Sequence, residues 1–313
     1  ADLHVIMCSL QRDAKRKEII YMKKSRKTAI VIGVILLIGI YYYVTLPAIN
    51  IHSTDTWFYI AGLIVFILVF YIIRKRMRPT EIRESKPAKA MLTVLLAVGV
   101  VYLIGSILSS PIVNAKKYQK LLKVEKGNFT EDVEEVSFDS VPLLDKDTAE
   151  ILGDRKMGSM VDMVSQFEAD DIYTQINYKE RPVRVTPLKY ASFIKWITNQ
   201  SEGIPAYIRI DMASQNTELV KLDQGIKYST SEYLNRNIYR HLRFRYPTAI
   251  FDELSFEIDD KGVPYWVAPV KKFNIGLFGG ETVGSVVLCN AVTGDCKSYK
   301  IEDVPQWVDR AYS

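Results

Sequence analysis

The chain has 313 residues, of which 48% are hydrophobic and 25% are charged, and its formal net charge is +5. Residues 1–113 carry 15 basic and 6 acidic side chains, whereas residues 114–313 carry 26 and 30. The basic excess therefore belongs to the N-terminal third. A nucleic-acid-binding protein is not indicated, because it would need a basic face on its folded part. The length suits about two domains.

Three apolar runs without charge follow one another in this third: Ala29–Val44, Trp57–Ile73 and Ala90–Leu108. Each is about long enough to cross a bilayer, and aromatic residues near the run ends match interfacial positions. We expect a three-helix membrane anchor over residues 28–113.

The distribution of lysine and arginine predicts the orientation of the chain in the membrane. The segment before the first run and the connection between the second and third runs are rich in both, whereas the connection "TLPAINIHSTDT" has none. Positively charged loops stay in the cytoplasm. Residues 1–27 are therefore expected inside the cell and everything after the third run outside. Because "MKKSRKTAIVIGVILL" from Met22 reads like a natural start, we interpret residues 1–21 as a translated leader.

Residues 114–146 are expected to form a polar stalk and an acidic connector. After them, Asp147 and Glu150 have the spacing of a capping box, which predicts a helix from this point to about Val164. At the other end, "VPQWVDRAYS" has the pattern of an amphipathic helix.

The sequence between these helices repeats itself. Residues 171–189 align without a gap on residues 253–271, and residues 206–222 align less closely on residues 285–301. Matching residues include Ile176 with Ile258, Pro182 with Pro264, Pro187 with Pro269 and Lys189 with Lys271. Each copy predicts a helix followed by antiparallel hairpins. We therefore expect an α+β domain made of a tandem repeat, with copies at 147–228 and 229–313, the second copy open to truncation at its end.

Proline and glycine refine this expectation. Pro cannot donate to a strand ladder, so Pro187 and Pro269 are expected at strand ends or on an edge. The stretch "GLFGGETVG" lacks the Lys-Ser/Thr of a phosphate loop and is expected to be a flexible crossing loop or a bulge.

The second copy resembles a known family. The turn in "VVLCNAVTGDCKSYKI", with Asn290, Ala291, Thr293, Gly294 and Asp295, is similar to the most recognisable part of PepSY modules in bacterial extracytoplasmic proteins. The resemblance implies a non-catalytic module outside the membrane, of the kind found in peptidase propeptides and cell-envelope proteins. It transfers no catalytic residues.

Two of the three cysteines flank this turn. If Asn290 pairs with Asp295, Cys289 and Cys296 lie opposite each other within reach of a disulfide. An oxidising compartment would permit the bond. Two reduced, packed cysteines are the alternative. A zinc site is not expected, since four ligands are usual and no histidine is near in sequence.

Further chemistry is not indicated. The chain has no nucleophile, zincin or Walker motif, so we assign no catalytic residue, metal or cofactor. In "YRHLRFRYP", the residues Arg240, Arg243 and Arg245 are expected on an amphipathic helix, with an anionic-polymer or lipid-headgroup site as the alternative.

The sequence thus favours a multi-pass membrane protein, not an enzyme, whose extracytoplasmic domain acts in binding or scaffolding in a bacterial cell envelope. Its expected partners are membrane lipid and an envelope protein or wall polymer. The alternative is a subunit of an envelope enzyme or transporter whose catalytic part lies in a partner or in a missing C-terminal region.

Overall fold

The computed structural model describes residues 28, 30–121, 126–133, 135, 137 and 141–311. Two compact units make up the chain, residues 1–47 and residues 48–313. In the first unit the apolar run forms the helix Ile30–Thr45. The expected cytoplasmic segment 1–27 lies outside the described residues.

Two helices of the second unit are long and apolar enough to cross a membrane: α2 (Thr54–Lys75, 22 residues) and α4 (Lys86–Ser109, 24 residues). Most of their side chains are exposed to the surroundings, as lipid-facing side chains would be. The helix Ile30–Thr45 is shorter than the roughly 20 residues that a span needs, so the expected third span is not established.

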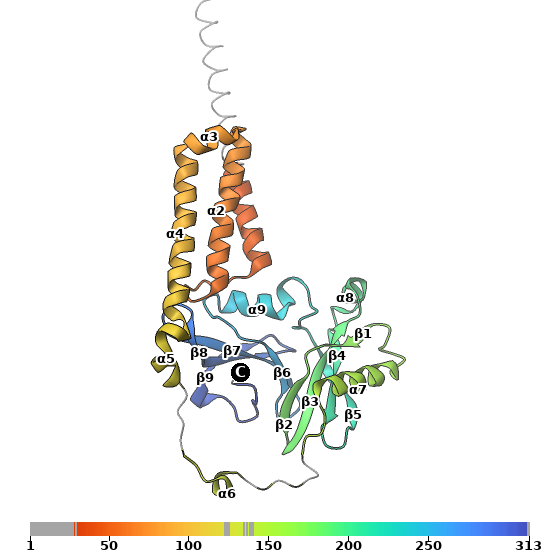
Figure 1. The fold of residues 1–313 in the computed structure, drawn as a ribbon. Coiled ribbons are helices and arrows are strands. Elements are labelled where there is room, and N and C mark those ends of the chain that lie inside the picture. Colours follow the sequence, from red (N-terminus) through yellow and green to blue (C-terminus); the bar gives the residue numbers. More distant parts are fainter. Residues whose placement is uncertain are drawn as a thin grey trace, which may run out of the picture. The chain divides into compact units, whose positions relative to one another are not determined.

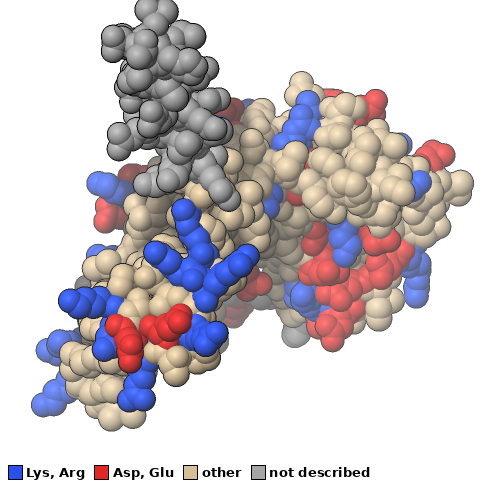
Figure 2. Space-filling model, turned by 90° about the horizontal axis from the view of Figure 1, so that it is seen from above, with Lys and Arg blue, Asp and Glu red and all other residues tan. Residues whose placement is uncertain are grey.

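The end of the α2–α4 pair is basic. The short helix α3 (Pro79–Glu84) joins the two long helices, and the segment between them is rich in Lys and Arg. Figure 2, which views the molecule of Figure 1 from above, shows basic side chains gathered around acidic ones at this end. Ser85 begins α4 by accepting a hydrogen bond from the backbone N–H of Ala88.

The expected stalk and connector contain α5 (Pro111–Gln119) and the single-turn α6 (Phe129–Asp132), and α7 (Lys146–Gly158) follows them. The carboxylate that caps α7 belongs to Asp145, which accepts from the N–H of Thr148 at 2.8 Å. The predicted cap at Asp147 is therefore wrong by two residues. The helix also ends at Gly158 instead of near Val164, because a turn follows it.

The α+β domain contains two antiparallel sheets (Figure 1). In the first, the strand order is β1-β3-β4-β5, and β2 also pairs with β3. Helix α8 (Phe193–Asn199) connects β3 to β4. The strands are β1 (Phe167–Ala169), β2 (Thr174–Tyr178), β3 (Arg181–Tyr190), β4 (Ile204–Asp211) and β5 (Thr217–Ile226).

The second sheet has the order β6-β7-β8-β9 and follows the 3₁₀ turn η2 (Leu234–Arg236) and helix α9 (Ile238–Arg245). Its strands are β6 (Ser255–Ile258), β7 (Pro264–Ile275), β8 (Gly279–Asn290) and β9 (Cys296–Lys300). Each half of the domain is thus a helix followed by a meander of antiparallel strands.

The two aligned segments are both hairpins, but their registers differ. Ile176 pairs with Val183 in the first, whereas Ile258 pairs with Pro264 in the second, which is one residue away from the aligned position. The cause is turn length. Two residues, Lys179 and Glu180, join β2 to β3, whereas residues 259–263 join β6 to β7. An alignment without a gap predicts the same register in both hairpins, and this prediction is wrong.

The two matching prolines are not at strand ends or on edge strands. Pro187 lies inside the central strand β3 and Pro269 inside the central strand β7. Each falls opposite a break between the neighbouring strands. There the carbonyl of Pro187 accepts from the N–H of Asp170 at 3.0 Å, and that of Pro269 accepts from the N–H of Asp252 at 2.8 Å. The carbonyl of Asp170 accepts from Oγ1 of Thr186 at 3.0 Å.

One hydrophobic core runs through both sheets. Tyr207 from β4 and Phe256 from β6 are fully buried, and their rings meet at 6.1 Å, while Phe256 also contacts Trp266. At the junction, the N–H of Phe256 donates to Oγ1 of Thr174, which is the aligned residue of the first half. Equivalent positions of the two halves therefore touch each other.

The C-terminal segment is not the predicted helix. After η3 (Ile301–Asp303) it crosses the second sheet without regular structure, burying Val308 and Ala311. The backbone N–H groups of Asp309 and Arg310 donate to the buried carboxylate of Glu257, and so are satisfied outside a helix.

Candidate functional site

Cys289 and Cys296 lie directly opposite each other on β8 and β9, with their Cα atoms 4.0 Å apart, and a disulfide joins them. Cys289 is fully buried and Cys296 is partly exposed. The bond closes a hairpin of sequence separation 7, so it constrains this turn and not the whole domain.

Asn290 builds the turn inside the disulfide. Its Oδ1 accepts from the N–H groups of Val292 and Thr293, both at 2.9 Å, and its own N–H donates to the carbonyl of Asp295. Gly294 has φ +77°, a conformation that glycine adopts without strain. The residues that carry the PepSY resemblance are thus those that satisfy the turn's backbone.

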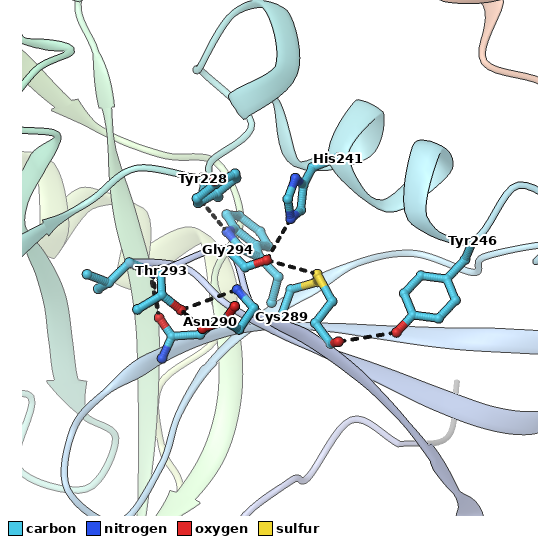
Figure 3. Close-up of a disulfide and its surroundings, with 11 residues drawn as sticks. Tyr228, His241, Tyr246, Cys289, Asn290, Thr293 and Gly294 are labelled. Carbon is cyan, nitrogen blue, oxygen red and sulfur yellow. Dashed lines mark hydrogen bonds between the residues drawn. A yellow bond between two sulfur atoms is a disulfide. The ribbon is translucent and has the colours of Figure 1, made fainter.

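Three side chains surround the disulfide (Figure 3). His241 from α9 contacts the carbonyl of Gly294 through Nε2 at 2.7 Å, Tyr246 donates to the carbonyl of Cys296, and the ring of Tyr228 packs against His241. A carbonyl only accepts, so Nε2 carries the imidazole hydrogen. Burial lowers the pKa of His241 from its ordinary value, which favours this neutral form.

This geometry limits the chemistry of the group. The ligand atoms of His241, Cys289 and Cys296 lie within 4.8 Å of one another, which the sequence did not indicate. In the oxidised form both sulfurs are used in the disulfide and Nε2 donates to Gly294, so none of these atoms offers a thiolate or imidazole lone pair to a metal ion. In this form the disulfide closes the turn between β8 and β9.

The three arginines do not form one open cluster. Arg240 donates to the carbonyl of Leu234 at 2.8 Å, and Arg243 donates to that of Ala249 at 2.6 Å and lies over the ring of Phe251. Both guanidinium groups thus hold the ends of α9 in place. Arg245 is exposed.

The glycine-rich stretch is not a loose loop. Strands β7 and β8 continue as a hairpin arm, residues 271–283, beyond a bulge between Val270 and Lys271. The tip of the arm meets the C-terminal end of α4, where Oγ of Ser109 accepts from the N–H groups of Leu277 and Phe278 at 2.9 and 3.1 Å.

Further contacts fix this tip. The hydroxyl of Tyr118 accepts from the N–H of Gly280 at 3.1 Å, and Nδ1 of His52 contacts the carbonyl of Leu277 at 2.7 Å. Phe278 packs among the rings of Trp57 and Tyr102. A Cβ at Gly276 or Gly279 would collide with Ser109, so the glycines permit the close approach. The domain is therefore attached to α2 and α4 by a defined interface.

A groove of about 510 Å³ lies where the two halves of the domain meet. Its walls include Tyr178 and Tyr207, the exposed amines of Lys221 and Lys261, and Thr293 from the disulfide turn. Tyr207 donates to the carbonyl of Gly262, which holds the turn of the second half against the first. The groove thus combines an aromatic surface with two ammonium groups.

Two carboxylates, which the sequence did not predict as site residues, are buried in the domain. Glu232 accepts from Oη of Tyr190 at 2.8 Å and from Nε1 of Trp196 at 2.7 Å, and burial raises its pKa. Glu257 is fully buried, and burial raises its pKa to about 7 despite hydrogen bonds from Asp309, Arg310 and Ser255. Asp/Glu-rich sequences give no signal that distinguishes such residues from exposed ones.

No family model, curated protein or solved structure matches this chain.

Proposed function

We propose that the chain is a membrane-anchored, non-catalytic binding or scaffolding protein of a bacterial cell envelope. In this proposal the helix Ile30–Thr45 is a third span in addition to α2 and α4, and the N-terminus is cytoplasmic. The distribution of Lys and Arg supports this orientation. The disulfide supports it too, because such bonds persist in oxidising compartments outside the cytoplasm.

We also propose that the extracytoplasmic domain is a tandem repeat, whose second copy is a PepSY-like module. The support is the shared order of helix and meander, and the matching hydrogen bonds from Asp170 to Pro187 and from Asp252 to Pro269. A duplicated module needs no catalytic residues to create a surface between its copies.

The groove between the two halves is the observation that carries the binding function. Tyr178 provides a half-buried ring against which a sugar or an aromatic group can pack, and Lys221 and Lys261 provide charges that attract an anionic group. The tip of the arm holds the domain on α2 and α4, so the groove has a fixed position relative to the anchor. An anionic wall polymer has the chemistry that fits this groove.

Binding is tested with the purified full chain and isolated wall polymer, teichoic acid and peptidoglycan separately. The variant Lys221→Gln with Lys261→Gln is expected to lose binding, while Lys146→Gln with Lys156→Gln, on α7 outside the groove, is expected to retain it. Equal binding by both variants would overturn the assignment to the groove.

Topology is tested separately by labelling intact cells with a thiol reagent that cannot cross membranes. In a background without Cys8, a cysteine at Ser214 is expected to react and one at Ser85 is not. Reaction of Ser85→Cys alone would reverse the proposed orientation.

A further inference from the structure

An apolar surface is exposed where the two halves of the domain meet near α8. It consists of one side of α8, from the first half, together with η2, from the second, and we call it the α8 face. Ile194 is 69% exposed and Leu234 is 63% exposed. The remaining members are also exposed large hydrophobic residues: Phe193, Ile197 and Tyr233. A contiguous apolar surface of this kind indicates a contact with another apolar phase.

The α8 face has a rigid base. Trp196, on the opposite side of α8, is buried, and its indole N–H donates to the buried carboxylate of Glu232. Tyr190 from β3 donates to the same carboxylate. The rings of Phe193 and Trp196 contact that of Tyr233 at 5.1 and 4.7 Å, which joins α8 to η2. The exposed side chains are thus held outward on a fixed support.

The position of α8 follows from the comparison of the two halves. Pro187 pairs with Tyr207 on strands β3 and β4, and the aligned Pro269 pairs with Val286 on β7 and β8. Beyond these pairs the first half continues as α8 and the second as the arm. Helix α8 and the arm therefore occupy equivalent positions in the two sheets. The arm ends on Ser109, the last residue of α4.

Helix α9 extends this surface toward the long helices. The carbonyl of Pro247, two residues after α9, accepts from the N–H of Ile49, and Asn50 donates to the carbonyl of Thr248. On α9, Tyr239 and Phe244 are about half exposed. The segment from 233 to 251 contains four arginines and no acidic residue. Aromatic and basic side chains together are typical of the bilayer interface.

We propose that the α8 face docks on the lipid bilayer that α2 and α4 cross, with the apolar side chains of α8 and η2 inserted at the boundary between headgroups and acyl chains. This inference rests on the proposed membrane anchor. The arm fixes one half of the domain at the end of α4, and the α8 face fixes the other half on the surrounding lipid. Lipid contact at the α8 face thus adds to the attachments that the arm and residues 247 and 248 already make.

The test is electron paramagnetic resonance on the full chain in nanodiscs containing zwitterionic and anionic lipid. Cys8 is replaced by Ser, and single cysteines at Ile194, Ser214 and Leu103 carry a spin label. Oxygen, which concentrates in lipid, and a water-soluble nickel chelate report on the surroundings of each label. The parent without an added cysteine must take up no label, as Cys289 and Cys296 are joined.

Leu103→Cys on α4 is expected to favour oxygen, and Ser214→Cys, at the far end of its sheet, is expected to favour the nickel chelate. Ile194→Cys is expected to resemble Leu103→Cys. If Ile194→Cys resembles Ser214→Cys while Leu103→Cys favours oxygen, the docking proposal fails and the anchor stands. If Leu103→Cys also favours nickel, the anchor itself fails.

A second measurement separates other occupants of the α8 face. Dipolar broadening between labels at Ile194 would indicate a second copy of the chain and would overturn lipid docking. As a variant, Ile194→Glu with Ile197→Glu is expected to make a label at Tyr233→Cys accessible to nickel, whereas Ile194→Leu with Ile197→Leu is expected to leave it in lipid. No difference between the two variants would also contradict the proposal.

Discussion

The two halves of the α+β domain build the same turn from different residues. In the first half, Oδ1 of Asp211 accepts from the backbone of the second and third residues after it, as Asn290 does in the second half. Gln215 donates to the carbonyl of Asp211 at 2.8 Å, and Gly294 donates to that of Asn290 at 2.9 Å. Both Gln215 and Gly294 have positive φ. Both halves therefore make the same hydrogen bonds in this turn, even where their residues differ.

The halves differ where the chain leaves these shared positions. The first half inserts α8 and the second inserts the arm, between otherwise equivalent strands. Opposite the shared turn, Ile210 pairs with Thr217 in the first half, whereas the disulfide joins the equivalent residues in the second. The hydrogen bonds that satisfy the backbone of the turn are therefore common to both halves. The side chains and the insertions differ, and they give each half a different contact.

The largest expected difference between the two halves is in how pH affects stability. It concerns Glu257, whose aligned residue in the first half is the exposed Gln175. Burial raises the pKa of Glu257 to about 7. A raised pKa contributes stability that is complete below the unfolded pKa, near 4.5, and is lost as the pH rises through about 7. The wild-type free energy of unfolding should thus fall by on the order of 3 kcal/mol between these limits.

Melting curves from pH 5 to pH 8 check this. Glu257→Gln should flatten the pH profile, whereas the matched Gln175→Glu, which adds an exposed carboxylate, should not steepen it. An unchanged slope in Glu257→Gln would show that other groups, such as the neighbouring Asp309, cause the pH dependence.

The next largest expected effect on the free energy of unfolding comes from substitutions in the shared turn. At Gly294 a Cβ would enter the ring of Tyr228, and φ +77° is strained for alanine. Gly294→Ala is therefore expected to lower the free energy of unfolding by about 2–4 kcal/mol. Gln215 already tolerates its positive φ, so Gln215→Gly should relieve strain and stabilise by about 1 kcal/mol. Denaturant unfolding measures both, and equal effects would contradict the steric argument.

The disulfide should have a smaller effect. Replacing Cys289 with Val and Cys296 with Thr imitates the pair of Ile210 and Thr217, which forms the same register without a covalent bond. The domain should stay folded and lose about 2 kcal/mol, since the closed loop is short. Mass spectrometry of the wild type, extracted with its thiols blocked, should find both cysteines unlabelled. Two blocked thiols at these positions would show that the bond does not form in the cell.

Several features of the fold could be predicted from the sequence because they depend on local pattern. The apolar lengths indicated α2 and α4, and alternation with turn residues indicated the hairpins on both sides of Asn290. The prolines show the limit of such reasoning. Whether Pro187 needs an edge depends on where β1 and β2 end beside it, and that is decided by the sheet as a whole.

The environment of the candidate site could not be predicted for the same reason. His241 reaches the disulfide only because α9 packs over β8 and β9, across 53 residues from Gly294. Ser109 receives the arm across 168 residues from Leu277. Neither residue belongs to a motif, and each makes its contact through backbone groups, which any sequence offers.

The smallest difference lies in two aligned lysines. Lys189 contacts the carboxylate of Asp171, which is 87% exposed, at 3.1 Å. Lys271 lies between two carboxylates, Asp252 at 3.3 Å and Glu281 at 2.9 Å, and both carboxylates are less exposed than that of Asp171. Exposed ion pairs contribute about 0.2–1 kcal/mol, so Lys271→Met should cost up to about 1 kcal/mol and Lys189→Met only a few tenths.

Salt distinguishes an ion pair from simple packing of the lysine stems. Raising the ionic strength should weaken the wild type toward Lys271→Met, because screening weakens the attraction between Lys271 and its two carboxylates, which this variant lacks. The same change should leave the difference between the wild type and Lys189→Met nearly constant. If both variants lose the same stability at every salt concentration, the second carboxylate does not stabilise the arm. Glu281 is then only a solvated residue on its surface.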